Sequence, residues 1–453
     1  MKHWTAGLLL FIACGDDGGG GTRTDGGNGN EDGGGSDAEM INPDAGKVVT
    51  TWGTNGIAIT GGGNVDSLTC IVEQTEPAAM GGRIVFAGRG SAGSGLYTGF
   101  AWGSVFGNGM TPSNEGIMVE RIGGAQSGDV NNCTATADNE VYVSGTARAN
   151  AGVKYAAVFK LAGSVIDTTW GDLDGPGGGP GVGQATTESG AGVDNGSEGY
   201  AAVELSDGKV VLAGGYRTMG DVDNRNFYLY RFEASGLPDY TFGPDPTYAG
   251  SVSPAGGIGE AHVPIILSDG RILAAGRIDN AIAVQRFTAT GALDGTFGTV
   301  GTVKTMFAVE RVAFSPPSSL LGFSNAGGKV TLYRASIEGV ADATFGTDGA
   351  LEPTVPAMFY ALDVVVQPNG KILVAGYDQG DGALVVLRFT AAGAPDTTWN
   401  GTGVTKLDVS SRIQVPQGPR LLLGKDGTSV YVGAFGVVSG NIYAQYFAVK
   451  LYL

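Results

Sequence analysis

Short runs of apolar, β-branched residues alternate with turn residues along this chain, most clearly over residues 361–403. Two such runs, Leu362–Val366 and Ile372–Ala375, flank Asn369-Gly370, a dipeptide that accepts positive φ at both central positions of a tight hairpin. A third run ends at Arg388-Phe389, and a fourth opens at Gly403 after a polar connector. This pattern predicts four antiparallel strands.

The same unit recurs along the chain. A basic residue closes the third run of most copies, at Lys160, Arg231, Arg286, Arg334, Arg388 and Lys450. The connectors that follow carry an aspartate at Asp167, Asp239, Asp294, Asp342 and Asp396. Counted by the connector aromatic, seven units begin near Trp52, Phe106, Trp170, Phe242, Phe297, Phe345 and Trp399. Four short strands at a spacing of roughly 50 to 70 residues predict the blades of an all-β propeller rather than a helical solenoid. Six blades remain an alternative, because the first two units depart from the pattern and Phe106 lacks the aspartate.

The two ends of the chain predict a closed ring. The last unit stops at Leu453 directly after its basic strand, whereas residues 44–53 form a connector with no strand before it. Gly46 precedes Trp52 at the same spacing as Gly393 precedes Trp399. The N-terminal segment can therefore complete the last unit and remove the free edges. An open β-solenoid is the alternative, but it would need capping ends, and none is visible in the sequence.

These repeated residues resemble the delta-60 repeat family. The resemblance rests on strands such as Asp269-Gly-Arg-Ile-Leu-Ala-Ala-Gly276 and on connectors such as Leu293-Asp-Gly-Thr-Phe-Gly298. It is strongest between about Tyr200 and Gly403. The resemblance implies propeller blades in an exported bacterial protein, and it implies no particular chemistry.

The N-terminus predicts export. Lys2 and His3 precede an apolar segment, Leu8–Ala13, and Cys14 follows directly, as in a signal peptide. Phe11–Cys14 resembles a bacterial lipobox, which implies cleavage before Cys14 and a diacylglycerol on its sulfur. The alternative is an ordinary signal peptide with an incidental cysteine. Residues 15–43 are rich in Gly, Asp and Asn, a composition typical of a flexible tether. We therefore expect a signal peptide over 1–14, a tether over 15–43 and the propeller over 44–453, lipid-anchored to the cell envelope at the outer membrane or cell surface.

Charge narrows the range of partners. The net charge of −17 over 453 residues argues against nucleic acid and against direct binding to anionic membranes, because both require basic patches. The expected contact with the membrane is the lipid anchor alone, and we expect a monomer. An unidentified protein or a carbohydrate remains as the ligand.

Two cysteines lie at matching positions of successive units. Cys70 and Cys133 each precede the hairpin of their unit, and neighbouring blades bring matching inner strands close together. Because an exported protein meets oxidising conditions, a Cys70–Cys133 disulfide is one prediction, and two free thiols are the alternative.

The repeated connector residues are expected to be structural, because a catalytic site is normally unique. The aspartates should cap turns and pair with the basic residue seven or eight positions earlier, as Asp396 with Arg388. An acidic ligand ring is the alternative. The connector aromatics are expected to fill the space between blades, and a role as sugar-stacking platforms is the alternative.

Few residues suggest chemistry. His262 is the only histidine beyond His3, so multi-histidine metal sites are excluded for the mature chain, and no nucleophile motif such as G-x-S-x-G occurs. Tyr200 and His262 align with Leu362, which places them near one rim of the channel, although a partly buried structural histidine is the simpler interpretation. Two unusual loops offer alternating carboxylates, a weak pattern for Ca²⁺ or for a catalytic pair, at Asp172, Asp174, Asp221 and Asp223.

The sequence thus predicts a non-catalytic binding or display module without a required cofactor. The alternatives are a propeller hydrolase or lyase that uses carboxylates at the channel mouth, and a purely structural envelope protein. An enzyme should gather non-repeated polar residues at one rim of the channel, whereas a display module should spread them over outer loops.

Overall fold

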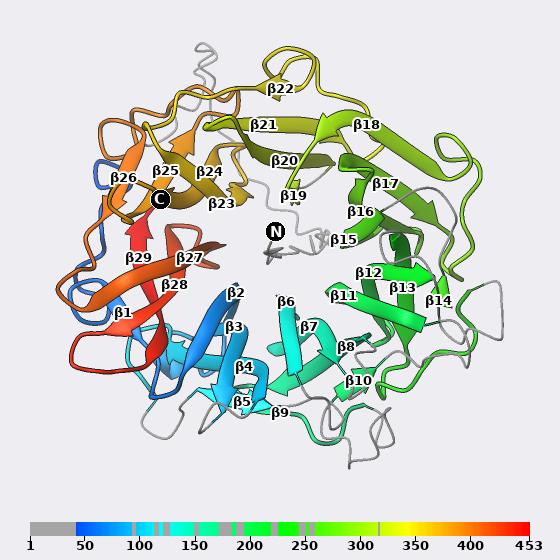
Figure 1. Ribbon diagram of the computed structural model, residues 1–453, viewed down its shortest axis with the longest axis horizontal. Coiled ribbons are helices and arrows are strands. Elements are labelled where there is room, and N and C mark those ends of the chain that lie inside the picture. Colours follow the sequence, from blue (N-terminus) through cyan, green and yellow to red (C-terminus); the bar gives the residue numbers. More distant parts are fainter. Residues whose placement is uncertain are drawn as a thin grey trace, which may run out of the picture.

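The computed structural model describes residues 42–92, 97–112, 117–120, 127–148, 154–171, 184–186, 194–218, 225–243, 251–252, 259–315 and 318–453. In this part of the chain the strands form seven blades around a central channel, with the first strand of each blade nearest the axis (Figure 1). Five blades are separate four-stranded sheets, and the first two are joined into one nine-stranded sheet. The predicted seven-bladed, all-β propeller is confirmed.

The blades follow one another around the ring in chain order. Blade 1 comprises β2 (Val65–Gln74), β3 (Arg83–Ala92), β4 (Tyr97–Phe106) and β5 (Met118–Glu120), with a 3-10 turn at Ala78–Met80. Blade 2 comprises β6 (Ser127–Ala135), β7 (Glu140–Arg148), β8 (Lys154–Ala162), β9 (Val165–Ile166) and β10 (Gln184–Thr186). Blade 3 comprises β11 (Asp194–Glu204), β12 (Val210–Thr218), β13 (Arg225–Phe232) and β14 (Ser251–Val252).

The later blades are more regular. Blade 4 comprises β15 (Gly259–Ile266), β16 (Ile272–Ile278), β17 (Ala281–Phe287) and β18 (Thr302–Ala308). Blade 5 comprises β19 (Arg311–Ser315), β20 (Ser319–Ala326), β21 (Lys329–Ser336) and β22 (Ala350–Leu351). Blade 6 comprises β23 (Phe359–Val366), β24 (Ile372–Asp378), β25 (Leu384–Phe389) and β26 (Val404–Leu407). Blade 7 combines β27 (Ile413–Leu423), β28 (Ser429–Val438) and β29 (Ala444–Tyr452) with β1 (Ile57–Ile59).

The two ends of the chain close the ring within blade 7. β1 pairs antiparallel with β29, Ile57 lying opposite Val449, and Val48 forms a further bridge with Leu451. In Figure 1 the blue β1 lies beside the red β29. The N-terminal segment thus supplies the outer strand of the last blade, which confirms the predicted closure and covers the edge of β29.

The hairpin at Asn369-Gly370 differs from the expected tight turn. Within it, positive φ occurs at Gly370 (+82°) but not at Asn369. The Gln367 amide donates to Lys371 O at 2.8 Å, so the loop extends over 367–371. This geometry corresponds to a type I turn followed by a left-handed glycine. Pro368 explains the difference, because its ring holds φ near −65°, which suits the first central position of a type I turn.

A β-bulge recurs in the inner strands. The register shifts by one residue at Thr69, Asn131, Tyr200, His262 and Leu362. The facing strand carries a glycine beside each bulge, namely Gly88, Gly145, Gly214, Gly276 and Gly376. A Cβ on any of these glycines would lie 2.0–2.1 Å from a carbonyl oxygen of the bulged strand. The bulge therefore explains why the second strand of these blades carries a glycine at this position, as in the repeated Ala-Gly pair.

We expect Gly376→Ala to destabilise the protein. The added Cβ would lie 2.0 Å from Tyr360 O, and overpacking of this kind costs about 1–3 kcal/mol or more. Gly295→Ala is the matched control, because nothing lies within 4 Å of a Cβ there, and it should change stability by less than about 0.5 kcal/mol. Urea unfolding measures both variants, and equal midpoints would contradict the steric role of Gly376.

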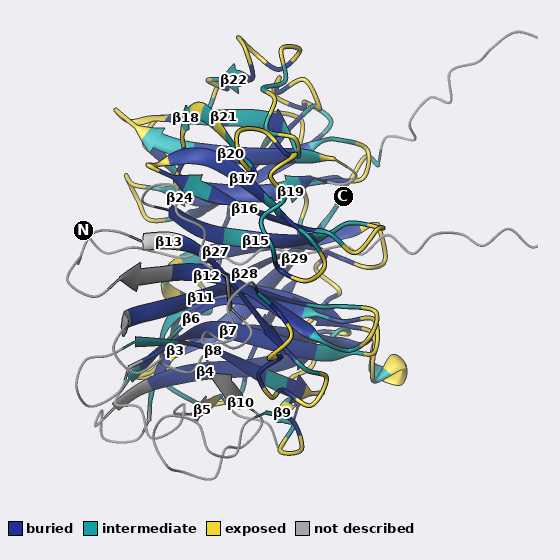
Figure 2. Ribbon diagram, turned by 90° about the vertical axis from the view of Figure 1, so that its right-hand side faces the viewer, coloured by how far each residue is buried: buried dark blue, intermediate teal, exposed yellow. Residues whose placement is uncertain are grey.

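Apolar clusters fill the seven interfaces between neighbouring blades. Six of them contain a connector aromatic, each at most 5% exposed: Trp52, Trp170, Phe242, Phe297, Phe345 and Trp399. Trp399, for example, belongs to one buried cluster with Leu373 of β24 and Val432 of β28. These aromatics therefore occupy the core rather than the surface. Most of the ribbon of the strands is likewise coloured as buried in Figure 2.

The remaining interface, between blades 1 and 2, contains a disulfide. Cys70 of β2 and Cys133 of β6 are bonded, with Cα atoms 5.7 Å apart. Both are 1% exposed, in a cluster with Trp102 and Phe159. Phe106, which the sequence suggested as the connector aromatic here, is instead the half-buried last residue of β4, opposite Arg83. The cross-link thus lies at the interface where the described cluster has no connector aromatic.

Candidate functional site

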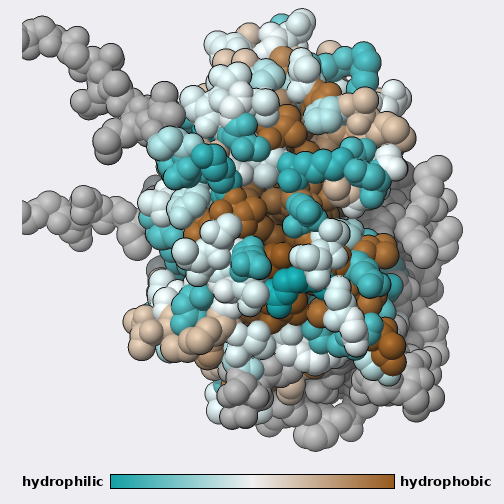
Figure 3. Space-filling view, turned by 90° about the vertical axis from the view of Figure 1, so that its left-hand side faces the viewer, coloured by the Kyte–Doolittle hydropathy of each residue, from teal (hydrophilic) through white to brown (hydrophobic). Residues whose placement is uncertain are grey.

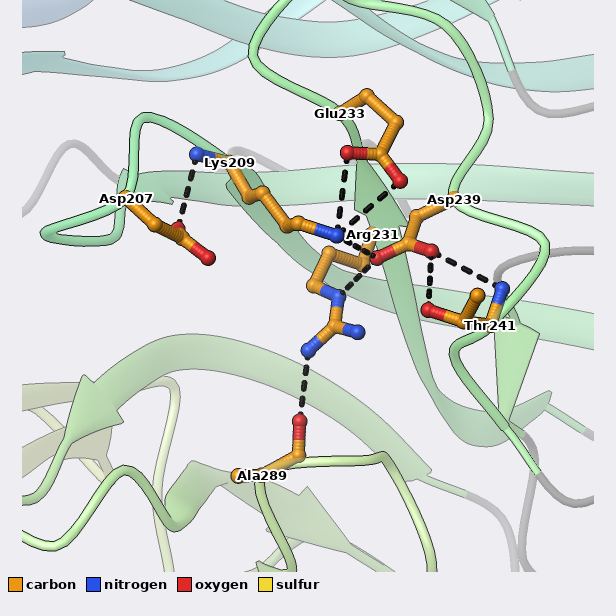
Figure 4. A network of polar contacts seen from close by, with 7 residues as sticks. All are labelled: Asp207, Lys209, Arg231, Glu233, Asp239, Thr241 and Ala289. Atoms are coloured by element: carbon orange, nitrogen blue, oxygen red, sulfur yellow. Dashed lines mark hydrogen bonds and ion pairs between the residues drawn. The ribbon is translucent and has the colours of Figure 1, made fainter.

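The repeated connector residues form a structural network in blades 2 to 6, shown for blade 3 in Figure 4. Asp239 accepts hydrogen bonds from Arg231 Nε (2.6 Å) and Lys209 Nζ (2.8 Å), and its other oxygen caps the backbone N–H and hydroxyl of Thr241. Arg231 also donates to Ala289 O of the next blade at 2.6 Å, and its guanidinium lies 4.4 Å from the centroid of the Phe242 ring. One arginine thereby ties its own connector to the neighbouring blade.

The same contacts recur in the later blades. Arg286, Arg334 and Arg388 each donate Nε to the connector aspartate at 2.7 Å. Each guanidinium lies 4.4–4.8 Å from the centroid of the connector aromatic. Blade 2 has a lysine instead, with Lys160 Nζ 3.6 Å from Asp167. These residues are therefore used by the fold, which leaves the non-repeated residues as candidates for function.

Stability should fall in acid because the connector carboxylates are held ionised. Hydrogen bonds from the hydroxyl and backbone N–H of Thr296, together with Arg286, lower the pKa of Asp294 from 3.8 to about 2. A depressed carboxylate pKa stabilises the fold above the unfolded pKa, and this stabilisation is lost as the pH falls through the folded pKa. We expect the free energy of unfolding to decrease between about pH 4 and pH 2. Asp294→Asn should make this decrease less steep in denaturant titrations at each pH, and an unchanged slope would contradict the assignment.

A hollow of about 1450 Å³, here called the channel-mouth pocket, opens where the inner strands of blades 3 to 7 converge. Its walls come from β11, β15, β16, β19, β20, β23, β24, β26 and β27. Charged and aromatic side chains from different blades line it, among them Tyr200, Glu260, His262, Arg277, Glu310, Arg311, Tyr360, Tyr377, Asp381, Lys406 and Arg420. None of these is a connector residue.

The wall formed by blades 3 and 4 is a packed polar cluster. His262 Nε2 lies 3.2 Å from Glu260 Oε2, and Arg277 donates to the same oxygen at 3.3 Å. The Tyr200 and His262 rings are 5.0 Å apart. Burial lowers the pKa of His262 below its ordinary 6.5, with Glu260 opposing the shift. His262 is therefore a neutral, largely buried histidine at neutral pH. It occupies the bulge of the inner strand β15, equivalent to Leu362 in β23.

The floor of the pocket ties blades 5, 6, 7 and 1 together. Arg311 donates to Leu362 O (2.6 Å) and to Asp363 Oδ1 (2.8 Å), while Asp363 Oδ2 accepts the Leu421 N–H at 2.8 Å. Arg420 donates to Thr69 O at 2.8 Å. Burial, followed by repulsion from Arg311, lowers the pKa of Arg420 from 12.5 to about 9. Here arginines bond the backbone carbonyls of the bulge residues of blades 6 and 1, Leu362 and Thr69.

The wall formed by blade 6 is aromatic. Tyr360 and Tyr377 lie directly opposite each other on β23 and β24, with ring centroids 5.6 Å apart and an interplanar angle of 29°. Both are half-buried. Burial, and then the Glu310 carboxylate, raises the pKa of Tyr360 above 10.0. Lys406 bonds Asp381 at 2.6 Å and Asp378 at 3.1 Å beside them.

The residues at the rung that Tyr360 and Tyr377 occupy differ between blades. The rung nearest the bulge is similar in blades 4 and 6, where Ala261 faces Gly276 and Ala361 faces Gly376. One rung farther toward the mouth, blade 4 carries the Glu260–Arg277 pair, whereas blade 6 carries Tyr360–Tyr377. Constant residues thus build the bulge, and the adjacent rung differs between blades.

The structure brings together some of the residues named from the sequence and not others. Tyr200 and His262 line the pocket, whereas the connector aspartates and aromatics do not. Asp172, Asp174, Asp221, Asp223 and the lipidation candidate Cys14 lie outside the described residues. Arg311, Arg420, Tyr360 and Tyr377 were missed by sequence reasoning. The available signal was departure from the repeat, since Tyr360 stands where blade 4 has Glu260.

Comparison with known proteins supports the fold. The model of a domain of unknown function described as DUF5122 beta-propeller matches residues 205–242, 267–297 and 367–398. Each match runs from the hairpin turn into the connector of blade 3, 4 or 6, and together they cover less than half of the chain. No curated protein matches the sequence.

Solved structures with similar folds are distant in sequence. A protein from Lactobacillus plantarum is 11% identical with a TM-score of 0.43, the match covering 84% of this chain and 100% of that one. Oligopeptidase B from Leishmania major is 12% identical with a TM-score of 0.40, and the match covers 89% of this chain but 50% of the peptidase. A PL25 ulvan lyase is 10% identical with a TM-score of 0.43, covering 83% and 92%. Similarity at this level says nothing about activity.

Proposed function

We propose that this protein is an exported, envelope-tethered propeller that binds a ligand in the channel-mouth pocket without transforming it. One observation carries the proposal: non-repeated charged and aromatic side chains converge on one hollow of about 1450 Å³. The repeated residues are engaged in turns and blade interfaces. A large concave site with a few convergent polar groups is the usual form of a ligand pocket.

Convergence on one rim was the pattern expected of an enzyme, and it argues against a purely structural role. Binding is nevertheless the better interpretation of these side chains. His262 is largely buried and neutral, Arg311 is paired with Asp363, and Lys406 is paired with Asp381. The named carboxylates therefore already have partners. A carboxylate-based hydrolase or lyase remains the second candidate.

Export and anchoring are supported by two separate features. The N-terminal segment ending at Cys14 has the charge and hydropathy pattern of a lipoprotein signal. The Cys70–Cys133 disulfide suits an oxidising compartment outside the cytoplasm. Within the described residues, no helix is both long enough and apolar enough to cross a bilayer. We propose a monomer held at the envelope by its lipid, with no affinity for nucleic acid because of the net charge of −17.

The anchor predicts where the protein fractionates. Produced in a bacterium that processes lipoproteins, the wild type should be found with the membranes. Cys14→Ser should be released into the soluble fraction or remain unprocessed, because it lacks the acceptor sulfur. Immunoblots of both fractions, with metabolic labelling by a palmitate analogue, measure this. Identical fractionation of the two forms would contradict the anchor.

Pocket binding can be tested by occlusion. Gln417 is exposed and lines the pocket, so Gln417→Trp should fill part of it, while Glu338→Trp places the same side chain at an exposed site elsewhere. Ligands that bind the native state raise the melting temperature. A panel of oligosaccharides, peptides, nucleotides and amino acids should contain a compound that stabilises the wild type and Glu338→Trp but not Gln417→Trp.

Other outcomes would overturn the proposal. Equal stabilisation of both tryptophan variants would place the ligand outside the pocket. Product formation by the wild type on polysaccharide, peptide or ester substrates, abolished by Gln417→Trp, would replace binding by catalysis.

A further inference from the structure

We propose that Tyr360 and Tyr377 form a stacking subsite for a sugar ring of a neutral glycan. The inference rests on the proposed function, since it assumes that the channel-mouth pocket binds a ligand, and it adds the ligand class and the subsite. The starting point is that blade 6 has an aromatic pair at the rung where blade 4 has an ion pair.

The geometry of the pair suits stacking. The two rings lie 5.6 Å apart at 29° and are half-buried in the wall of the pocket. They are neighbours on paired strands, so the sheet holds both rings in place. A half-buried tyrosine offers the apolar face of its ring and, beside it, a polar hydroxyl. The C–H face of a pyranose ring is a matching surface.

The polar side chains around the pair suit hydroxyl groups. Glu310, Asp381 and Lys406 line the same pocket, so carboxylate acceptors and an ammonium donor lie beside the rings. A sugar hydroxyl both donates and accepts, and it can therefore bond either type of group. A flat hydrocarbon ligand could not form hydrogen bonds with these charged groups, so it would fit the pocket less well than a sugar.

The charge balance favours a neutral glycan over an acidic one. Acidic residues lining the pocket outnumber basic ones by five to four: Glu260, Glu310, Asp363, Asp381 and Asp408 against Arg277, Arg311, Lys406 and Arg420. The whole chain has a net charge of −17. The pocket therefore lacks the excess of positive charge that a polyanionic glycan requires, and the chain as a whole repels such a ligand. The volume of the pocket, about 1450 Å³, allows more than one sugar ring.

Backbone strain at the pocket is a second, independent observation. Val415 has φ +50° and is 68% exposed, and Met358 has φ +63° and is 57% exposed. Val415 lines the pocket on β27, and Met358 directly precedes β23. Positive φ is rare for a β-branched residue, and such strain is concentrated at binding sites. Val415 therefore lines the same pocket as the tyrosine pair, and Met358 lies two residues before Tyr360.

The test uses calorimetry with a panel of neutral hexasaccharides, namely cellohexaose, xylohexaose, mannohexaose, maltohexaose and chitohexaose. We expect at least one to bind the wild type. Tyr360→Ala and Tyr377→Ala should each weaken that binding about tenfold, whereas Tyr360→Phe should retain it. Tyr240→Ala is the matched control, because Tyr240 is 62% exposed in a connector and does not line the pocket. Circular dichroism and melting curves establish that each variant is folded.

The outcomes separate this inference from the proposed function. Hexasaccharide binding that is unchanged in both alanine variants would overturn the stacking subsite. If no hexasaccharide binds but another ligand binds and is excluded by Gln417→Trp, the glycan assignment is wrong and the proposed function stands. If acidic glycans bind and neutral ones do not, the charge argument fails and the assignment is wrong.

Discussion

Removing residues 1–60 should abolish the native fold at ambient temperature. The truncation deletes β1 and Trp52, which fill the interfaces on both sides of blade 7. Trp52, Ile57 and Ile59 are 4%, 5% and 8% exposed, and loss of one buried Trp or Ile side chain costs about 2–5 kcal/mol. The sum exceeds about 5 kcal/mol, which is most of the stability of a typical domain. Circular dichroism and urea unfolding measure the effect.

The matched control is a chain that begins at Asn42. It keeps the pairing of β1 with β29 and the Trp52 contacts, so its stability should equal that of the longer chain. In the chain that lacks residues 1–60, the exposed edge of β29 should also cause aggregation. A synthetic peptide of residues 42–60, added in excess, should restore folding in a concentration-dependent manner. Equal melting temperatures for the two truncations would contradict ring closure as the source of stability.

The Cys70→Ala/Cys133→Ala double variant should lose about 2–4 kcal/mol of unfolding free energy. The cross-link joins residues 63 apart in the sequence, and the chain-entropy estimate for a loop of this length is about 4 kcal/mol. The variant should still fold, because Val72, Val143 and Phe159 remain in the same cluster. Chemical unfolding in the presence and absence of dithiothreitol measures the difference.

The reductant provides the internal control for this prediction. Dithiothreitol should bring the wild type to the stability of the double variant and leave the variant unchanged. Both cysteines are 1% exposed, so reduction should require partial opening of the interface between blades 1 and 2. Two alkylatable thiols in the oxidatively folded wild type would show that the bond does not form.

The sequence alone determined the repeat, favoured seven blades over six and predicted the way in which the ring closes, which the structure then confirmed. These properties depend on local signals, because alternating apolar runs set the strands and Asp-Gly or Asn-Gly marks the hairpins. The missing connector after Leu453 and the extra connector at 44–53 indicated the exchange of an outer strand. The connector residues, repeated in nearly every unit, could be assigned to the core for the same reason.

The tertiary structure decided how the inner strands bulge and what meets at the channel mouth. Arg311 and Leu362 are 51 residues apart and bond across two blades, and Arg420 reaches Thr69 at a separation of 351. No local pattern encodes such contacts, because they depend on blade rotation and on a one-residue register shift. The shift also explains why a glycine stands at 376, since a Cβ there would lie 2.0 Å from Tyr360 O. Tyr360 and Tyr377 line one pocket with Glu260 and Arg277, the equivalent rung of blade 4, because the ring brings these blades around a common hollow.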